Sequence, residues 1–144
     1  MTYNNSKIGI LLATFNSERF LKNQLHSIVS QTMRPHEIII SDDHSVDATN
    51  EILQSLHDDY GHSIRIDSGA NVGETLGLHS NFRNLFKLAL GSSCDVYLLS
   101  DHDDIWFSRK VETCVVALDS LNKLAAFGDC PLLVFSDLDR KSVV

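Results

Sequence analysis

Asp101, Asp103 and Asp104 lie within four residues and bring three carboxylates close together in the chain. Ionised carboxylates without a counter-charge repel one another, and a bound divalent cation relieves that repulsion. In an extended segment, residues i and i+2 face the same side, so Asp101 and Asp103 can address one ligand. Their oxygens suit Mg²⁺ or Mn²⁺, which keep several waters and bind substrate phosphates. The cluster therefore predicts a cation site for a phosphate-bearing ligand, although the same acids can cap a helix beginning near Phe107.

Asp42 and Asp43 form a second acidic group, expected at a strand end. One of these carboxylates can accept a hydrogen bond from the imide N–H of uracil or thymine, and the ring of Phe15 can lie against the base. The alternatives are a turn or cap role for the acids and a core role for the aromatic ring. Asn71 and Gly73 are either further ligand contacts or turn formers. Together these residues predict a nucleoside pocket.

Hydrophobic periodicity predicts the elements that position these residues. Short apolar runs alternate with amphipathic stretches, which is the pattern of βαβ units and a mostly parallel sheet, so the fold class is α/β. Strands are expected at residues 7–13, 37–42, 63–67, 96–100 and 132–136. The first helix is expected at about 17–31, with Asn16 or Ser17 as its cap. A second helix follows the turn at 41–45 and ends at about residue 56, and two more are expected around 82–89 and along 111–118. Ligands of such sheets bind beyond the carboxyl ends of the strands, where the polar groups 14–16, 42–43 and 101–104 stand.

Composition excludes several functions. The 144 residues carry 12 basic and 19 acidic side chains and a net charge of -7, which disfavours a nucleic-acid partner. Cys94, Cys114 and Cys130 are odd in number and lack CxxC spacing, so neither a disulfide framework nor a zinc site is expected. No apolar run reaches the ~18 residues of a membrane span. We therefore expect no transmembrane segment in this chain and a cytoplasmic location, at or near the inner face of the membrane.

Several ordered motifs resemble the N-terminal signature of family 2 glycosyltransferases. They are Ala13-Thr14-Phe15-Asn16, then Gln24-Leu25 with Ile28, Gln31 and Thr32, then Glu37 to Asp43 followed by Ser45, Asp47 and Thr49. The run Ser100 to Trp106, with Lys110, is similar to the Ser-Asp-Gln-Asp-Asp-Ile-Trp box of their bacterial rhamnosyltransferase-like branch. Two positions depart from the family pattern: Phe15 stands for the usual Tyr, and His102 for the usual Gln.

The resemblance implies a GT-A type, Rossmann-like nucleotide-binding domain with a mostly parallel central sheet and flanking helices. It implies a nucleotide-diphosphate sugar donor, dTDP-rhamnose or a UDP-sugar, held through Mg²⁺ or Mn²⁺, and transfer to a saccharide acceptor in cell-surface polysaccharide synthesis. Asp42 or Asp43 would contact the base, Asp101 the ribose or sugar, and Asp103 the metal. The residues assigned to the donor are Thr14, Phe15, Asn16, Asp42, Asp43, Asn71, Gly73 and Asp101, and those assigned to the metal are Asp103 and Asp101.

The resemblance also implies that residues 1–144 are a single nucleotide-sugar-binding part without the acceptor-binding part. The family's catalytic base lies further downstream, and Asp137, which ends an expected strand, is the acidic candidate within this chain. A sheet interrupted in this way is expected to self-associate through an exposed edge or apolar surface. Two other functions stay open: a non-catalytic nucleotide-binding or regulatory module, and a phosphatase of the haloacid dehalogenase type, whose Asp-x-Asp pair normally closes the first strand.

Overall fold

A parallel four-stranded sheet forms the centre of the molecule. The computed structural model describes residues 5–60, 64–67, 77–124 and 139–141. The strands of this sheet are β1 (Ile8–Thr14), β2 (Glu37–Asp42), β3 (Ile64–Asp67) and β4 (Val96–Ser100). They are paired in the order β3-β2-β1-β4, so the chain adds two strands on one side of β1 and then crosses to the other side. The predicted α/β class with a mostly parallel sheet is therefore confirmed.

Strand β1 is buried along its whole length, and its side chains alternate between two cores. Ile8, Ile10 and Leu12 belong to a cluster on one face of the sheet, while Leu11 and Ala13 belong to a cluster on the other face. Period-two alternation sends successive side chains to opposite faces of a strand. A continuous apolar run is what a parallel strand covered on both faces needs.

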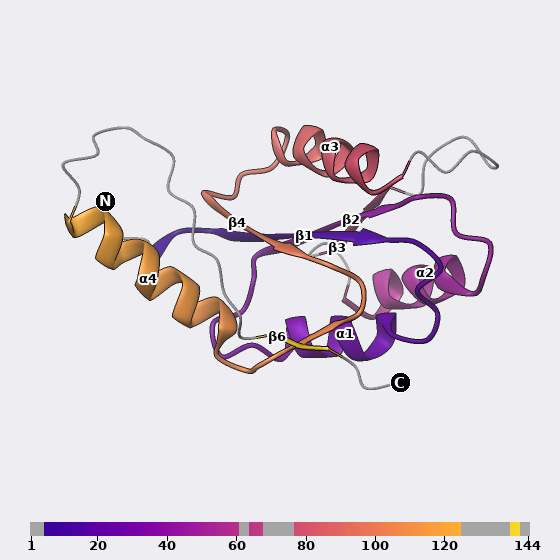
Figure 1. Cartoon of the computed structure of the whole chain (residues 1–144), viewed down its shortest axis with the longest axis horizontal. Coiled ribbons are helices and arrows are strands. Elements are labelled where there is room, and N and C mark those ends of the chain that lie inside the picture. The colour runs from indigo at the N-terminus through magenta and orange to yellow at the C-terminus, as the bar shows by residue number, and fades with distance from the viewer. Residues whose placement is uncertain (1–4, 61–63, 68–76, 125–138, 142–144) are drawn as a thin grey trace.

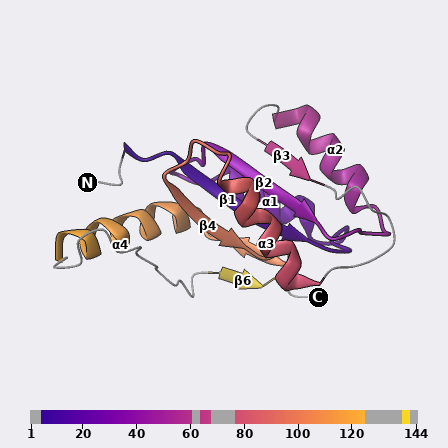
Figure 2. The same cartoon turned by 90° about the horizontal axis from the view of Figure 1, so that it is seen from above.

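Helices cover both faces of the sheet (Figures 1 and 2). They are α1 (Leu21–Val29), α2 (Thr49–Tyr60), α3 (Leu78–Ala89) and α4 (Lys110–Leu124). Figure 1 shows α3 above the sheet and α1 and α2 below it. Leu85 of α3 packs in the core of Leu11 and Ala13, and the apolar face of α1 packs against the opposite core. Side chains of α4 join the core on the α1 side, beginning with Val111.

Two short strands outside the main sheet are absent from the sequence prediction. Strands β5 (Asp104–Trp106) and β6 (Asp139–Lys141) pair antiparallel. A three-residue segment is too short to show a hydrophobic period, so periodicity could not find either strand. The strand expected at 132–136 lies outside the described residues.

Helix α1 is shorter than predicted. It begins at Leu21, whereas residues from Ser17 were expected to be helical. The hydroxyl of Ser17 accepts a hydrogen bond from the backbone N–H of Phe15, at 3.1 Å, and no side chain caps the helix at Phe20. The prediction that Asn16 or Ser17 caps α1 is therefore wrong, because the loop before α1 uses both side chains for its own hydrogen bonds.

Within the described part of the chain, no helix combines the length and the apolar character needed to cross a bilayer. Cys94 is a free thiol, and Cys130 lies outside the described residues. Burial raises the pKa of the Cys94 thiol, and the nearby charges of Glu37 and Asp95 raise it further.

Candidate functional site

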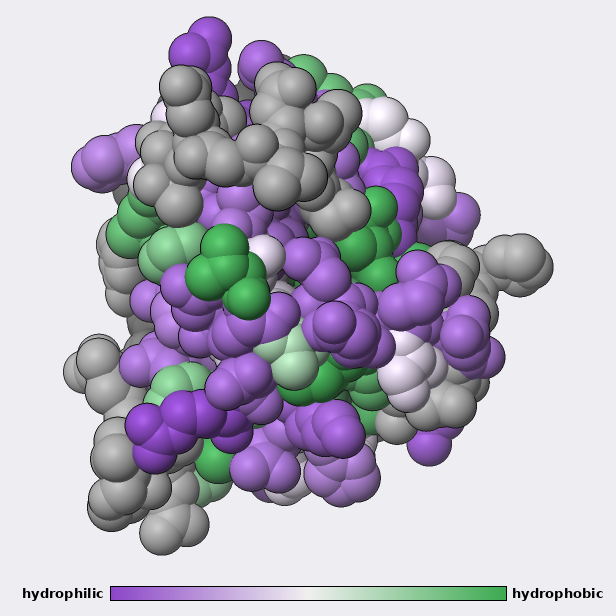
Figure 3. Space-filling view, turned by 90° about the vertical axis from the view of Figure 1, so that its right-hand side faces the viewer, coloured by the Kyte–Doolittle hydropathy of each residue, from purple (hydrophilic) through white to green (hydrophobic). Residues whose placement is uncertain are grey.

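The three polar groups of the sequence meet at one end of the sheet. Thr14 and Asp42 are register partners at the ends of β1 and β2, and Ser100, the last residue of β4, pairs with Leu12 of β1. Asp101 follows Ser100 directly. Figure 3 views the side toward which β1 points, and most of that surface is hydrophilic, with smaller hydrophobic areas. Ligands of open parallel sheets bind at this end, beside the point where the strand order reverses.

Asp42 is a buried carboxylate whose oxygens are held by the protein itself. Its side chain accepts hydrogen bonds from the Thr14 hydroxyl at 2.8 Å, the Ser45 hydroxyl at 2.6 Å and the Ser45 backbone N–H at 2.8 Å. Asp42 is 3% exposed and Thr14 is 1% exposed. These two side chains therefore fasten β1, β2 and the following turn together.

The loops after β1 and β2 are joined by hydrogen bonds that run in both directions. The backbone N–H of Asn16 donates to the Ser45 hydroxyl at 2.8 Å, and the Asn16 side-chain carbonyl accepts from Val46 N–H at 3.0 Å. The backbone N–H of Ser17 donates to the Thr49 hydroxyl at 2.7 Å. Asn16 has a φ of 47°, a left-handed conformation that asparagine adopts more readily than most residues. The sequence analysis predicted that Asn16 contacts the ligand. In the structure, the side-chain oxygen of Asn16 accepts the hydrogen bond from Val46 N–H in the loop.

Asp47 and Glu18 complete the connection between the two loops. The Asp47 carboxylate accepts from the backbone N–H groups of Glu18 at 3.1 Å and Thr49 at 3.0 Å, and Glu18 in turn accepts from Ala48 N–H at 3.0 Å. Burial raises the pKa of Asp47, but the hydrogen bonds from the Thr49 hydroxyl and from backbone N–H groups outweigh it and lower the pKa overall. The ionised form of Asp47 is therefore the form that stabilises the start of α2.

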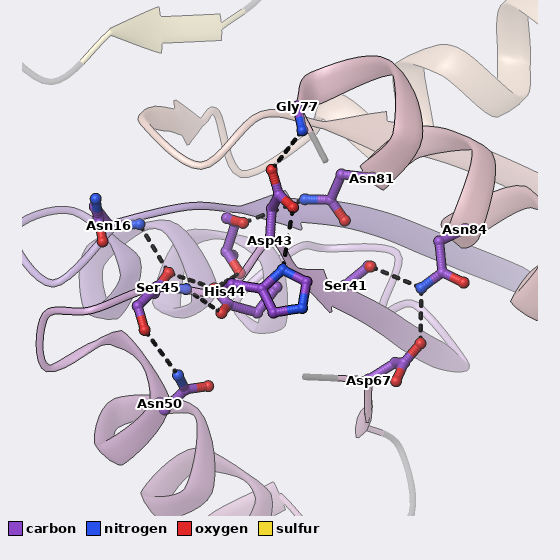
Figure 4. Close-up of polar contacts among 12 residues, drawn as sticks. Asn16, Ser41, Asp43, His44, Ser45, Asn50, Asp67, Gly77, Asn81 and Asn84 are labelled. Carbon is purple, nitrogen blue, oxygen red and sulfur yellow. Dashed lines mark hydrogen bonds and ion pairs between the residues drawn. The ribbon is translucent and has the colours of Figure 1, made fainter. Parts of the chain in front are cut away.

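Asp43 sits at the amino end of α3. Its carboxylate accepts a hydrogen bond from Gly77 N–H at 2.9 Å, and its backbone N–H donates to the Thr14 carbonyl at 2.9 Å (Figure 4). Gly77 has a φ of 78°, which favours glycine. The helix N-terminus stabilises a negative charge at this position.

A cleft of about 270 Å³ opens between the end of β2 and α3. Its lining residues are Ser41, Asp42, Asp43, His44, Ser80, Asn81, Arg83, Asn84 and Lys87. Buried carboxylates form its floor, and the exposed cations Arg83 and Lys87 stand at its rim. Phe15, at the end of the neighbouring strand β1, is 41% exposed and is therefore not a core residue. The cleft combines hydrogen-bond acceptors with a positively charged rim.

Both ends of the acidic segment after β4 are anchored by α1. The Gln24 side-chain amide donates to the Ser100 hydroxyl at 2.5 Å, and the Ser27 hydroxyl accepts from Trp106 N–H at 3.0 Å. Trp106 is buried, and the ammonium group of Lys110 lies 4.3 Å from the centre of a Trp106 ring. Trp106 and Lys110 therefore fix the chain directly after the acidic residues 101–104.

The acids themselves are more exposed than those of the cleft. The Asp101 side chain is 51% exposed and lies 3.3 Å from Nδ1 of His102. The hydrogen bond to Asp101 raises the pKa of His102, burial opposes it, and the charges of Asp101, Asp103 and Asp104 raise it further. Among the described residues, no group of three His, Cys, Asp or Glu side chains is arranged to hold a metal ion. The segment concentrates negative charge on a partly exposed surface.

Sequence reasoning and structure differ on which residues surround the cleft. Asn71, Gly73 and Asp137 lie outside the described residues. His44 and Asn81 were not predicted, although both line the cleft. Asn81 carried a signal, because it stands one helical turn before Leu85 on the apolar side of α3 and is 6% exposed. No sequence pattern indicated that His44 would line the cleft, because its position depends on a left-handed backbone conformation with a φ of 59°.

Comparisons with known proteins give the family. The family model described as "Glycosyl transferase family 2" matches residues 9–133. The dTDP-rhamnosyl transferase RfbG of Shigella flexneri is 34% identical over 107 residues, which are 74% of this chain and 36% of that protein. The GalNAc(5)-diNAcBac-PP-undecaprenol beta-1,3-glucosyltransferase of Campylobacter jejuni is 32% identical over 69% of this chain and 30% of that protein. The chain thus spans about a third of the length of these relatives.

Solved structures share the fold. S. aureus TarS in complex with UDP-GlcNAc has a TM-score of 0.65 and 20% identity, covering 79% of this chain and 31% of that one. The mannosyltransferase PcManGT of Pyrobaculum calidifontis, in complex with GDP-Man and Mn²⁺, has a TM-score of 0.64 and 17% identity, covering 81% and 32%. At these identities the likeness shows the GT-A fold. Since the family model covers most of the sequence, the chain belongs to glycosyl transferase family 2.

Proposed function

We propose that this chain binds the nucleotide-diphosphate sugar of a metal-dependent glycosyltransferase. The observation that carries the proposal is the shared placement of the cleft and the acidic segment at the carboxyl ends of β2 and β4. Two inter-strand spacings separate these strands, or about 10 Å. A nucleoside diphosphate laid across β1 would have its base in the cleft, its ribose beside Phe15 and its phosphates at Asp101–Asp104.

Asp43 is the better candidate of the two neighbouring acids for the base. The oxygens of Asp42 already accept three hydrogen bonds from Thr14 and Ser45. Asp43 lines the cleft at the start of α3, where an acceptor can receive a ring N–H. In this assignment Asp42 and Thr14 position the pocket, and Asp43 contacts the ligand.

A divalent cation fits the acidic segment by its chemistry. Mg²⁺ and Mn²⁺ bind through one or two carboxylates and complete their coordination with waters and substrate phosphates, so a cage of three protein ligands is not required. Asp103 and Asp101 would hold the ion. The bound ion would supply Lewis-acid stabilisation of the departing diphosphate. The protein's own contribution is to orient the donor and hold the acids in place through Gln24 and Ser27.

We infer the donor sugar nucleotide and the acceptor from the names of the relatives. The Shigella flexneri relative is named a dTDP-rhamnosyl transferase, which supports dTDP-rhamnose beside UDP-sugars. A relative named for an undecaprenol-linked glycan supports a saccharide acceptor in cell-surface polysaccharide synthesis, at the inner face of the membrane. Self-association through an exposed sheet edge or apolar surface stays a prediction, and Leu99 on β4 is 47% exposed. The assignment of Asp137 as base is likewise an expectation.

Calorimetry on three purified proteins tests the proposal. Wild type, Asp103→Asn and the control Asp58→Asn, on the exposed side of α2, are titrated with UDP and dTDP with and without Mn²⁺. We expect Mn²⁺-dependent binding that Asp103→Asn weakens by at least about tenfold, as the loss of a charged metal contact predicts, and that Asp58→Asn leaves unchanged. Unchanged metal-dependent affinity in Asp103→Asn would exclude the metal role. Absence of any nucleotide binding by the folded wild type would exclude the function itself.

A further inference from the structure

Two buried polar atoms at the cleft lack a hydrogen-bond partner within the described structure. They are Nε2 of His44 and Oδ1 of Asn81. The His44 side chain is 8% exposed, and Asn81 is 6% exposed. A buried acceptor without a donor destabilises the structure that holds it. Figure 4 shows the His44 ring and the Asn81 amide beside Asp43, with Ser41 and Asn84 on the far side of the same space. Both atoms can therefore form a hydrogen bond with a ligand in the cleft.

The amide orientation of Asn81 is determined by its neighbour. Its Nδ2 donates to the backbone carbonyl of Thr14 at 3.2 Å. A carbonyl oxygen only accepts, so the amide nitrogen must face Thr14 and the amide oxygen must face away. Oδ1 of Asn81 is therefore an acceptor, and it needs a donor from the ligand.

The tautomer of His44 follows in the same way. Its Nδ1 lies 3.4 Å from Oδ1 of Asp43, and an ionised carboxylate only accepts. Nδ1 therefore carries a proton, and in this tautomer Nε2 is an acceptor. Asn84, which also lines the cleft, differs from both residues because its amide donates within the protein to Ser41 at 2.9 Å and Asp67 at 2.7 Å.

We propose that Asn81 and His44 determine which nucleobase the donor carries, by accepting hydrogen bonds from N–H groups on the base edge. The inference rests on the proposed nucleotide-binding function and adds the specificity of its base pocket. Uracil, thymine and guanine present a ring N–H beside a carbonyl, whereas adenine and cytosine present a ring nitrogen lone pair at that position. A lone pair facing Oδ1 of Asn81 is repelled, and a ring N–H is bound.

The two acceptors divide the selection between them. Oδ1 of Asn81 shares with the Asp43 carboxylate the ring N–H that uracil, thymine and guanine carry. Nε2 of His44 receives the exocyclic amino group that guanine carries beside its ring N–H. Uracil and thymine present a carbonyl oxygen there, so they pair with Asn81 and leave Nε2 of His44 unpaired. The exposed cations Arg83 and Lys87 at the rim supply donors for the carbonyl oxygens of the base. A specificity pocket of this kind discriminates because a mismatched base leaves buried acceptors unpaired.

Affinities for a set of nucleoside diphosphates test the inference. UDP, dTDP, GDP, CDP and ADP are titrated in the presence of Mn²⁺ into wild type, Asn81→Leu, His44→Asn and the control Asn84→Leu. Wild type should bind UDP, dTDP and GDP at least about tenfold more tightly than CDP and ADP. Asn81→Leu should bring the five affinities together, and His44→Asn should weaken GDP more than UDP. Asn84→Leu should keep the wild-type order.

His44→Asn keeps the test decisive if Asn81→Leu does not fold, because asparagine accepts the left-handed backbone of residue 44 and its shorter side chain withdraws the acceptor. Mn²⁺-dependent binding with equal affinity for all five bases would overturn the specificity while leaving the proposed function intact. An order of affinities that the soluble Asn81 and His44 variants do not change would also overturn it. Absence of binding to every nucleotide would overturn the proposed function and the inference together.

Discussion

The two halves of the site are built in opposite ways. On the β2 side, Asp42 is 3% exposed and accepts hydrogen bonds from Thr14 and Ser45. The two loops there are joined by hydrogen bonds from backbone N–H groups to side-chain oxygens. On the β4 side, the Asp101 side chain is 51% exposed, and the segment is anchored at its ends by α1. A base needs a rigid, shaped surface, because discrimination rests on fixed donors and acceptors. A cation that shares its ligands with water and phosphate needs charge and access instead.

The same substitution at one aspartate of each half gives the largest expected difference. Asp42→Asn puts an amide where a buried carboxylate accepts hydrogen bonds, and it should lower the free energy of unfolding by about 3 kcal/mol. Asp103→Asn alters a partly exposed strand-end acid and should change it by less than about 0.5 kcal/mol. Urea denaturation followed by circular dichroism measures both values. Equal losses would show that the acidic segment is as integral to the fold as the β2 side.

A second prediction concerns the left-handed backbone of the loop after β1. Asn16→Ala places an alanine at a φ of 47° and removes the acceptor of Val46 N–H, and it should cost about 1–2 kcal/mol of stability. Asn16→Gly is the matched control, since glycine adopts this conformation without the steric cost. The glycine variant should therefore lie between wild type and alanine in its urea midpoint. Identical midpoints for the two variants would assign the whole effect to the lost side chain.

The third prediction uses the pH dependence of the connection between the loops. Asp47→Ala removes the acceptor for Thr49 N–H at the start of α2 and should cost about 1 kcal/mol at neutral pH, as for other helix caps. Hydrogen bonds lower the pKa of Asp47 in the folded protein, so its stabilisation is full above the ordinary value of 3.8. It is lost as the pH falls through the lower folded-state pKa.

The difference between wild type and Asp47→Ala should therefore be constant above pH 5 and shrink below pH 3.8, in denaturation curves taken over this range. Asp47→Asn is the control, because asparagine caps a helix without ionising. A difference that stays constant down to the lowest pH at which the protein folds would contradict the lowered pKa.

The fold was predictable where burial enforces a pattern. Strands β2 and β4 lie at the predicted residues, because their apolar runs have polar or turn residues at both ends. Strand β1 ends one residue later than predicted, at Thr14, whose side chain is buried by its hydrogen bond to Asp42. Periodicity measures which residues are apolar, so it does not detect a polar side chain buried through hydrogen bonding.

The meeting of the polar groups at one end of the sheet was predictable, but the contacts around the cleft were less so. The carboxyl ends of β1, β2 and β4 follow from strand order, which parallel-sheet topology restricts strongly. The sequence indicates that Asn81 lies on the inward side of α3, one turn before Leu85. Its contact with the cleft does not follow from the sequence, because it depends on the packing of Leu85 against β1 and β2. The position of His44 depends on a single left-handed residue in a turn. Contacts made between elements distant in the chain require the tertiary structure.

The placement of β1 in the middle of the sheet also bears on the order in which the molecule folds. Strand β1 pairs with β2 across one short helical connection, whereas its other neighbour is β4, and the contact of Lys7 with Asp95 closes a separation of 88 residues. Contacts between residues far apart in the chain pay a larger loop-closure entropy and form more slowly than local ones. The β1-α1-β2 unit, which holds Asp42 and the joined loops, can therefore assemble on a growing chain before β4 has been synthesised. The acidic segment after β4 would then join a β1-α1-β2 unit that has already folded.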